Sequence, residues 1–153
     1  MDFSKFLVAP DLEHVIQIGL AYILALPIGW DREESARGVG LRTFPLVAVA
    51  SCAFVIIGQV ALQGGDAQDK ILAGLMTGIG FIGGGAILRN DNSVAGTSTA
   101  ASIWITGAIG AAVAWHLYPI AVLLTALDFL TLRYFGGLKQ NIGENAEEEH
   151  ESK

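Results

Sequence analysis

The feature that most constrains the fold is an uncharged apolar run at residues 71–88 that is rich in glycine. As a helix, this run would be about 27 Å long, close to the ~30 Å hydrocarbon core of a bilayer. Glycines four residues apart allow helix backbones to approach closely in lipid, whereas a triple glycine indicates an unwound or bent turn. Both interpretations stay open for the six glycines of the run, which are Gly74, Gly78, Gly80, Gly83, Gly84 and Gly85.

The composition favours a membrane protein. Apolar residues make up 52% of the chain, charged residues only 16%, and the mean hydropathy is +0.52. The sequence therefore predicts an all-α membrane protein, a compact bundle of about five transmembrane helices. We expect these helices at about residues 12–30, 44–63, 71–88, 98–117 and 118–132.

The basic residues predict the orientation of this bundle. With five spans, one side receives most of the basic side chains, namely Arg32, Arg37, Arg42, Arg89, Arg133, Lys139 and Lys153. The positive-inside rule then places the N-terminus outside and the C-terminus in the cytoplasm. We expect an external segment (1–11), a transmembrane domain (12–133) and an acidic cytoplasmic tail (134–153) that is largely disordered. The acidic charge argues against nucleic acid as a partner.

Polar side chains gather at the predicted cytoplasmic ends of the helices. Ordinary anchoring explains part of this pattern, and the alternative is a functional site in which Arg42 or Arg32 pairs with Asp31 or Glu33 from the adjoining helix end. Asp128 lies deeper, in the fifth span, where it either reaches the interface or turns toward the bundle. The candidate site comprises Asp31, Arg32, Glu33, Arg42, Thr43, Arg89, Asn90, Thr97, Thr99 and Asp128.

Metal binding and catalysis are less favoured by the residues present. Asp31, Glu33 and Asp91 carry the hard oxygen ligands that Mg²⁺ prefers, but the interleaved arginines oppose a cation, so we favour structural ion pairing and expect no cofactor. The triple glycine is not followed by the Gly-Lys-Ser/Thr of a phosphate-binding loop. No serine or cysteine has a plausible base in sequence reach, so we expect no enzyme.

Four segments resemble the MgtC/SapB family of bacterial membrane proteins. They are GWDRE at 29–33, RGVGLRT at 37–43, GIGFIGGG at 78–85 and VAGTSTAASIW at 94–104, in the order and spacing of that family. The resemblance is to a short form without the soluble C-terminal domain. It implies a multi-pass protein of the bacterial inner membrane that is tied to magnesium limitation, to acid or phosphate stress and, in some members, to virulence.

Two classes of function remain. The resemblance implies a non-enzymatic regulator that binds other membrane machines, such as ATP synthase, through helix–helix contacts. The alternative is a small transporter or channel for magnesium, protons or anions, with the third helix broken at its glycines. Asp128 is the one clear intramembrane charge. A single charge is little for a coupled transporter, so we favour the regulator. We also expect a homodimer in the lipid bilayer, formed through spans three and four or one and two.

Overall fold

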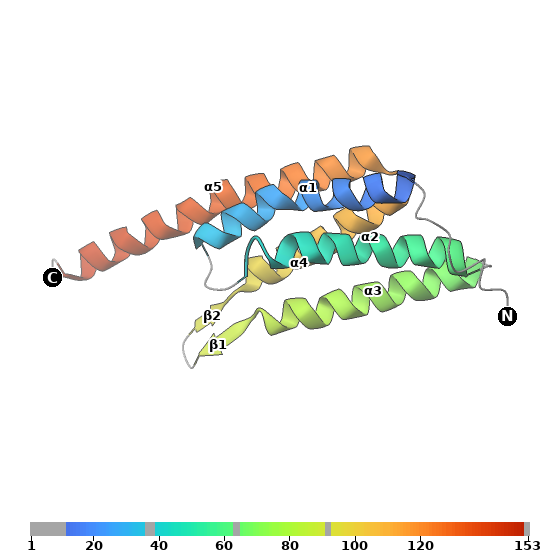
Figure 1. Cartoon of the computed structure of the whole chain (residues 1–153). Coiled ribbons are helices and arrows are strands. Elements are labelled where there is room, and N and C mark those ends of the chain that lie inside the picture. Colours follow the sequence, from blue (N-terminus) through green and yellow to red (C-terminus); the bar gives the residue numbers. More distant parts are fainter. Residues whose placement is uncertain (1–11, 36–38, 63–64, 91–92, 152–153) are drawn as a thin grey trace.

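The computed structural model describes residues 12–35, 39–62, 65–90 and 93–151. These residues form α1 (Leu12–Ser35), α2 (Thr43–Ala61), α3 (Gly65–Gly85), α4 (Thr97–Ala114) and α5 (Tyr118–Glu151). An antiparallel hairpin of β1 (Leu88–Asn90) and β2 (Ser93–Ala95) connects α3 to α4. Successive helices run in opposite directions, so α1, α3 and α5 all run toward the hairpin (Figure 1). We call this the hairpin end. The predicted all-helical bundle is confirmed.

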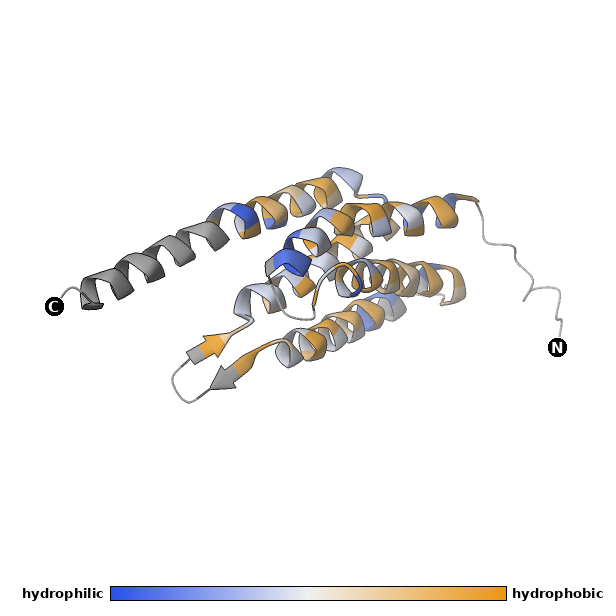
Figure 2. Cartoon of the chain, turned by 60° about the vertical axis from the view of Figure 1, so that its left-hand side comes forward, coloured by the Kyte–Doolittle hydropathy of each residue, from blue (hydrophilic) through white to orange (hydrophobic). Residues whose placement is uncertain are grey.

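Four of the helices, α1, α2, α4 and α5, are long and apolar enough to cross a membrane. The third predicted span is shorter than expected, because α3 starts with a polar turn and ends at Gly85. Its apolar part, from residue 71 to residue 85, is only about 22 Å long. Apolar residues are found along all five helices in Figure 2, and many large ones, such as Leu46 and Phe81, are exposed, as expected for a bundle surrounded by lipid.

Helix α4 forms the centre of the bundle and packs against each of the other four helices. In α4, 67% of the span is buried, compared with 22% in α5. Two glycines make this close packing possible. Gly110 lies against the backbone carbonyl of Ala48 in α2, and Gly107 lies against Ile79 in α3 and Ser51 in α2. Small residues therefore bring α4 into direct contact with its neighbours.

The glycines of α3 do not break the helix within its span. The helix is continuous from Gly65 to Gly85, and the next two N–H groups donate to the carbonyls of Gly83 and Gly84 at 3.1 and 3.2 Å. The predicted unwinding is thus a helix end that leads into the hairpin. Close packing is also only partly realised. Gly80 and Gly83 lie against α4, but no atom of the described residues lies within 4 Å of a Cβ added at Gly74, Gly78, Gly84 or Gly85.

The sequence predicts a largely disordered acidic tail, and the structure includes most of that segment in α5. Helix α5 continues through the tail to Glu151 and extends past the rest of the bundle (Figure 1). Glutamate, alanine, lysine and glutamine are good helix formers, and a high charge prevents burial without preventing a helix. The proposed three-part division of the chain stays a prediction, and its first part, residues 1–11, lies outside the described residues.

Gly96 directs the chain from β2 into α4. Its φ is +84°, in the left-handed region, and an added Cβ would overlap the carbonyl oxygen of Ala86. We expect Gly96→Ala to lower the free energy of unfolding by at least about 1–2 kcal/mol, since left-handed backbone disfavours any Cβ, and the overlap with the Ala86 carbonyl adds to this loss. Thermal unfolding in detergent, followed by circular dichroism, measures this loss. Gly84→Ala, at an open position of the same end, should show none; equal losses would contradict the explanation.

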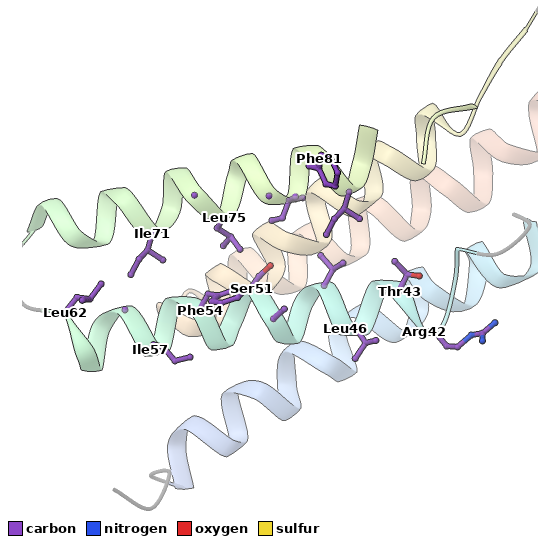
Figure 3. Close-up of a pocket in the computed structure, with 17 residues that line it drawn as sticks. Arg42, Thr43, Leu46, Ser51, Phe54, Ile57, Leu62, Ile71, Leu75 and Phe81 are labelled. Carbon is purple, nitrogen blue, oxygen red and sulfur yellow. The ribbon is translucent and has the colours of Figure 1, made fainter. Parts of the chain in front are cut away.

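An apolar groove of about 930 Å³ runs between α2 and α3. It extends from Arg42 and Thr43 at the hairpin end to Leu62 at the opposite end (Figure 3). We call it the α2–α3 groove.

Candidate functional site

The structure places the predicted polar residues at or near the hairpin end. Asp31, Arg32 and Glu33 lie near the end of α1, and Arg42 and Thr43 lie at the start of α2. Thr97 and Thr99 lie in the first turn of α4, and Asp128 lies within α5. Arg89 and Asn90 belong to β1, and their side chains are outside the part of the chain that the structure describes, as are Arg37 and Asp91 altogether.

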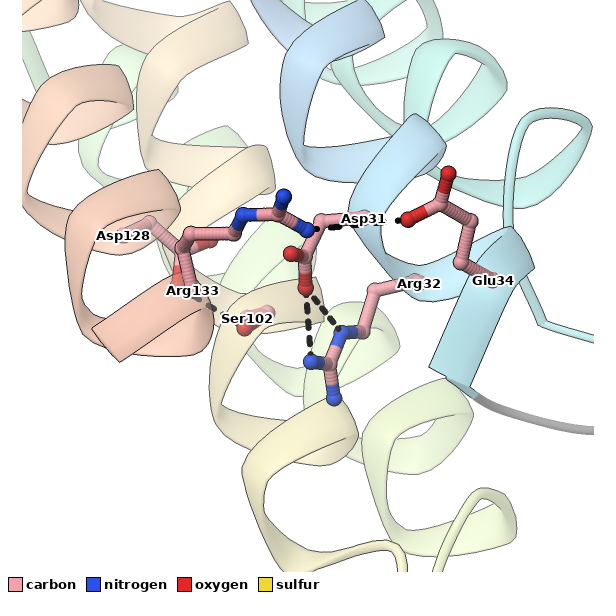
Figure 4. A network of polar contacts seen from close by, with 6 residues as sticks. All are labelled: Asp31, Arg32, Glu34, Ser102, Asp128 and Arg133. Atoms are coloured by element: carbon pink, nitrogen blue, oxygen red, sulfur yellow. Dashed lines mark hydrogen bonds and ion pairs between the residues drawn. The ribbon is translucent and has the colours of Figure 1, made fainter. Parts of the chain in front are cut away.

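Asp31 and Arg32 form a buried ion pair. The Asp31 Oδ2 atom lies 2.8 Å from Nη2 and 3.3 Å from Nε of Arg32 (Figure 4). Asp31 is only 5% exposed and Arg32 only 7%. The sequence predicted a pair between adjoining helix ends, but these two residues are consecutive in α1. The pair therefore forms within one helix and is buried where that helix packs against α4 and α5.

Glu33 and Arg42 lie outside this buried pair. Glu33 is exposed, and its Oε2 accepts a hydrogen bond from the backbone N–H of Leu41 at 3.0 Å. Gly40 packs directly on the backbone of Glu33, so the segment before α2 lies against the end of α1. Arg42 is exposed and makes no ion pair with any residue that the structure describes. Glu33 thus holds the segment before α2 against the end of α1, and Arg42 stays accessible at the start of α2.

Asp128 is turned into the bundle. It is 3% exposed, and its Oδ1 accepts a hydrogen bond of 2.8 Å from Oγ of Ser102 in α4. Within the described residues, its Oδ2 has no hydrogen-bond partner. The charges of Arg32 and Asp31 act on this carboxylate, and Figure 4 shows the four residues on neighbouring helices α1, α4 and α5. We call Asp31, Arg32, Ser102 and Asp128 the buried polar cluster.

Ser102 is the member of this cluster that our sequence reasoning did not single out. It follows Thr99 by three residues in α4, so the two side chains share a helix face, and both are buried. The signal available in the sequence was the spacing, because Ser102 lies three residues after Thr99, which was a predicted site residue. It was weak, because serine and threonine are common in membrane helices for packing alone.

The hydrogen bond from Ser102 leads to a direct prediction. Ser102→Ala should lower the free energy of unfolding by about 1–3 kcal/mol, because it removes the donor to a buried carboxylate. Thr106→Val is the matched control, since the Thr106 hydroxyl donates only to the Ser102 carbonyl of its own helix, at 2.8 Å. Unfolding of both variants in the same detergent compares them. A larger loss for Thr106→Val would contradict this assignment.

The three metal-ligand candidates are not brought together. Asp31 pairs with Arg32, Glu33 accepts the Leu41 N–H, and Asp91 is outside the described residues. Among the residues that the structure does describe, no group of three or more His, Cys, Asp or Glu side chains is close enough to hold a metal ion. The buried polar cluster instead places one guanidinium beside two carboxylates, an arrangement suited to joining helices or to holding a proton.

A sequence model described as the MgtC family matches residues 18–141, which include the whole buried polar cluster. The chain belongs to the MgtC family. Among curated proteins, it is 33% identical over 130 residues to "Putative magnesium transporter YhiD" of Escherichia coli, covering 80% of this chain and 60% of YhiD. It is 34% identical over 134 residues to "Protein SrpB" of Synechococcus elongatus, covering 79% and 74% of the two chains.

A shorter match joins this MgtC-family chain to "Protein MgtC" of Brucella abortus, with 37% identity over 90 residues, or 59% of this chain and 37% of that protein. The matched region therefore covers less than two thirds of the length of YhiD and of the Brucella protein. No solved structure matches the chain.

Proposed function

We propose that this MgtC-family chain is a regulator in the bacterial inner membrane, acting in adaptation to magnesium, acid or phosphate stress. In this proposal it is neither a carrier nor an enzyme, and it acts through contacts with other membrane proteins. The hairpin end faces the cytoplasm, in keeping with the positive-inside bias of the sequence. The four motifs shared with the family support the stress-related role.

The observation that carries the proposal is the continuity of α3. The transporter alternative relied on a break at the glycines, which would expose backbone carbonyls to an ion in the middle of the membrane. Helix α3 is unbroken through Gly83 and Gly84, and it ends only where the hairpin begins. The α2–α3 groove beside it has polar lining residues at Ser51 and, at the hairpin end, at Arg42 and Thr43, so it offers no row of ligands across the membrane to a hydrated ion.

The buried polar cluster suits a regulator because its residues come from three neighbouring helices. Asp31 and Arg32 come from α1, Ser102 from α4, and Asp128 from α5, the helix that extends beyond the bundle. A protein that binds the extended part of α5 thus acts on a helix whose position in the membrane depends on Asp128. Family resemblance makes a complex such as ATP synthase a candidate partner, and a homodimer in the bilayer remains part of the proposal.

Transport is the second candidate, and one observation favours it. The Oδ2 atom of Asp128 has no partner among the described residues, and an intramembrane carboxylate of this kind is a common proton or cation site. The name of the E. coli relative YhiD also refers to magnesium transport.

Flux measurements on the purified chain in liposomes separate the two candidates. We expect magnesium, proton and phosphate fluxes no higher than in empty liposomes, for the wild type and for Asp128→Asn alike. A wild-type flux that Asp128→Asn abolishes would establish transport and overturn the regulator. In a strain that lacks the chain, the regulator proposal further expects wild type to restore growth in low magnesium without changing magnesium uptake.

A further inference from the structure

The walls of the α2–α3 groove are suited to hydrocarbon. Both helices contribute apolar side chains, including Leu46, Phe54 and Phe81, and Phe81 is 85% exposed. Gly74 and Gly78 also line the groove, and in the part of the chain that the structure describes no atom lies within 4 Å of a Cβ added at either position. The absence of side chains at these two glycines keeps the groove open along α3. An exposed apolar groove of this size requires a hydrophobic occupant.

The hairpin end of the groove has the opposite character, because it is positively charged. Arg42 and Thr43 line it there, and neither side chain makes a hydrogen bond or ion pair with the residues that the structure describes. Arg42 immediately precedes α2, whose first turn contains no acidic residue and receives no side-chain capping bond from the described residues, while the N–H groups of Thr43 and Phe44 donate to the carbonyl of Gly40. The positive end of the helix dipole therefore adds to the guanidinium charge. A guanidinium, a hydroxyl and the positive end of a helix dipole together suit a phosphate group.

We propose that the α2–α3 groove binds one anionic phospholipid, with its phosphate at Arg42 and Thr43 and its acyl chains along α2 and α3. The groove extends from Thr43 to Leu62, which is about 29 Å of helix and thus the whole hydrocarbon thickness. A lipid of the leaflet at the hairpin end occupies the half nearest Arg42, between Leu46 on α2 and Gly78 on α3. This site is independent of the regulatory role proposed above.

The size of the groove favours a lipid over a protein helix. A helix with its side chains is about 10 Å wide, whereas this groove lies between two helices of one bundle, α2 and α3. A partner helix would lie on the groove without entering it. Acyl chains have no backbone and no branched side chains, so they fit a narrow space between two helices. A lipid also accounts for the unpaired charge at one end, which an apolar helix does not.

The first test uses native mass spectrometry of the full chain in mild detergent with added phosphatidylglycerol or phosphatidylethanolamine. We expect the wild type to retain the anionic lipid, and Arg42→Gln to retain it about fivefold less, the typical effect of one basic residue at an anionic surface. Arg133→Gln is the matched control, because Arg133 is exposed and does not line the groove. Equal retention by wild type and Arg42→Gln would overturn the proposal.

The second test fills the groove. Gly78→Leu places a side chain inside it, and Gly84→Leu places the same side chain at an equally open position outside it. We expect Gly78→Leu to lose the bound lipid with either headgroup while remaining folded, and Gly84→Leu to keep it. If Gly78→Leu instead converts a lipid-free dimer into monomers, the groove is occupied by a second copy of the chain. If inorganic phosphate binds at Arg42 regardless of Gly78→Leu, the site takes a free anion. Either result would overturn the lipid assignment.

Discussion

Asp31→Ala is expected to lower the free energy of unfolding by about 3–5 kcal/mol, the largest effect that we predict from one substitution. The Arg32 guanidinium lies 2.8 Å from Asp31, and Arg32 as a whole is only 7% exposed. Without that carboxylate, a positive charge remains buried and uncompensated. Titration with a denaturing detergent, monitored by tryptophan fluorescence, measures the loss, and the yield of folded protein should fall with it.

Glu34→Ala is the control for Asp31→Ala at the same end of the bundle. Glu34 and Arg133 are 3.7 Å apart and both side chains are mostly exposed, so their pair should contribute about 0–1 kcal/mol. Replacing both buried partners, as in Asp31→Leu with Arg32→Met, should recover much of the lost stability, because no buried charge is left. Equal losses for Asp31→Ala and Glu34→Ala would show that burial of the pair is unimportant.

Gly110→Ala is expected to destabilise the bundle by about 3 kcal/mol, the upper end of the usual effect of overpacking. An added Cβ would overlap the Ala48 carbonyl in the backbone of α2 and would lie 2.9 Å from the Cβ of Ser51. A backbone cannot rotate away as a side chain can, so α2 and α4 must separate. Thermal unfolding in detergent measures the effect.

Two other glycines provide a graded comparison with Gly110. At Gly107, an added Cβ meets the tip of the Ile79 side chain, which is flexible, so Gly107→Ala should be less destabilising. At Gly74, nothing is near, so Gly74→Ala should be neutral or stabilising by up to about 1 kcal/mol, through higher helix propensity. Any other order of the three variants would contradict this account of the packing.

The positions of the membrane helices could be predicted from the sequence because hydropathy and length determine them directly. The expected start of the second helix at residue 44 differs by one residue from the start of α2 at Thr43. The positions of charged residues and glycines in the sequence also indicated where the helices end. The third helix was harder, since residues 86–88 are as apolar as the helix before them yet belong to the turn and hairpin after Gly85.

The contacts between helices could not be predicted in the same way. Small-residue spacing identifies a face of a helix, but it does not say whether another helix covers that face. Gly74 and Gly78 had the expected spacing and face open space, whereas Gly110, which our sequence reasoning did not single out, contacts α2. Asp31 was among the partners predicted for Arg32, but the pair was expected between adjoining helix ends and it forms within α1, since pairing depends on how each helix is rotated in the bundle.

The hydrogen bond between Ser102 and Asp128 also has a consequence for how the chain enters the membrane during synthesis. A single helix with an aspartate near its centre inserts at a penalty of about 2.5–3.5 kcal/mol. Here the donor for that aspartate is on the preceding helix, and only Trp115, His116 and Leu117 separate α4 from α5. The two helices are therefore suited to leave the translocon together, with the serine already beside the carboxylate when lipid replaces water around them.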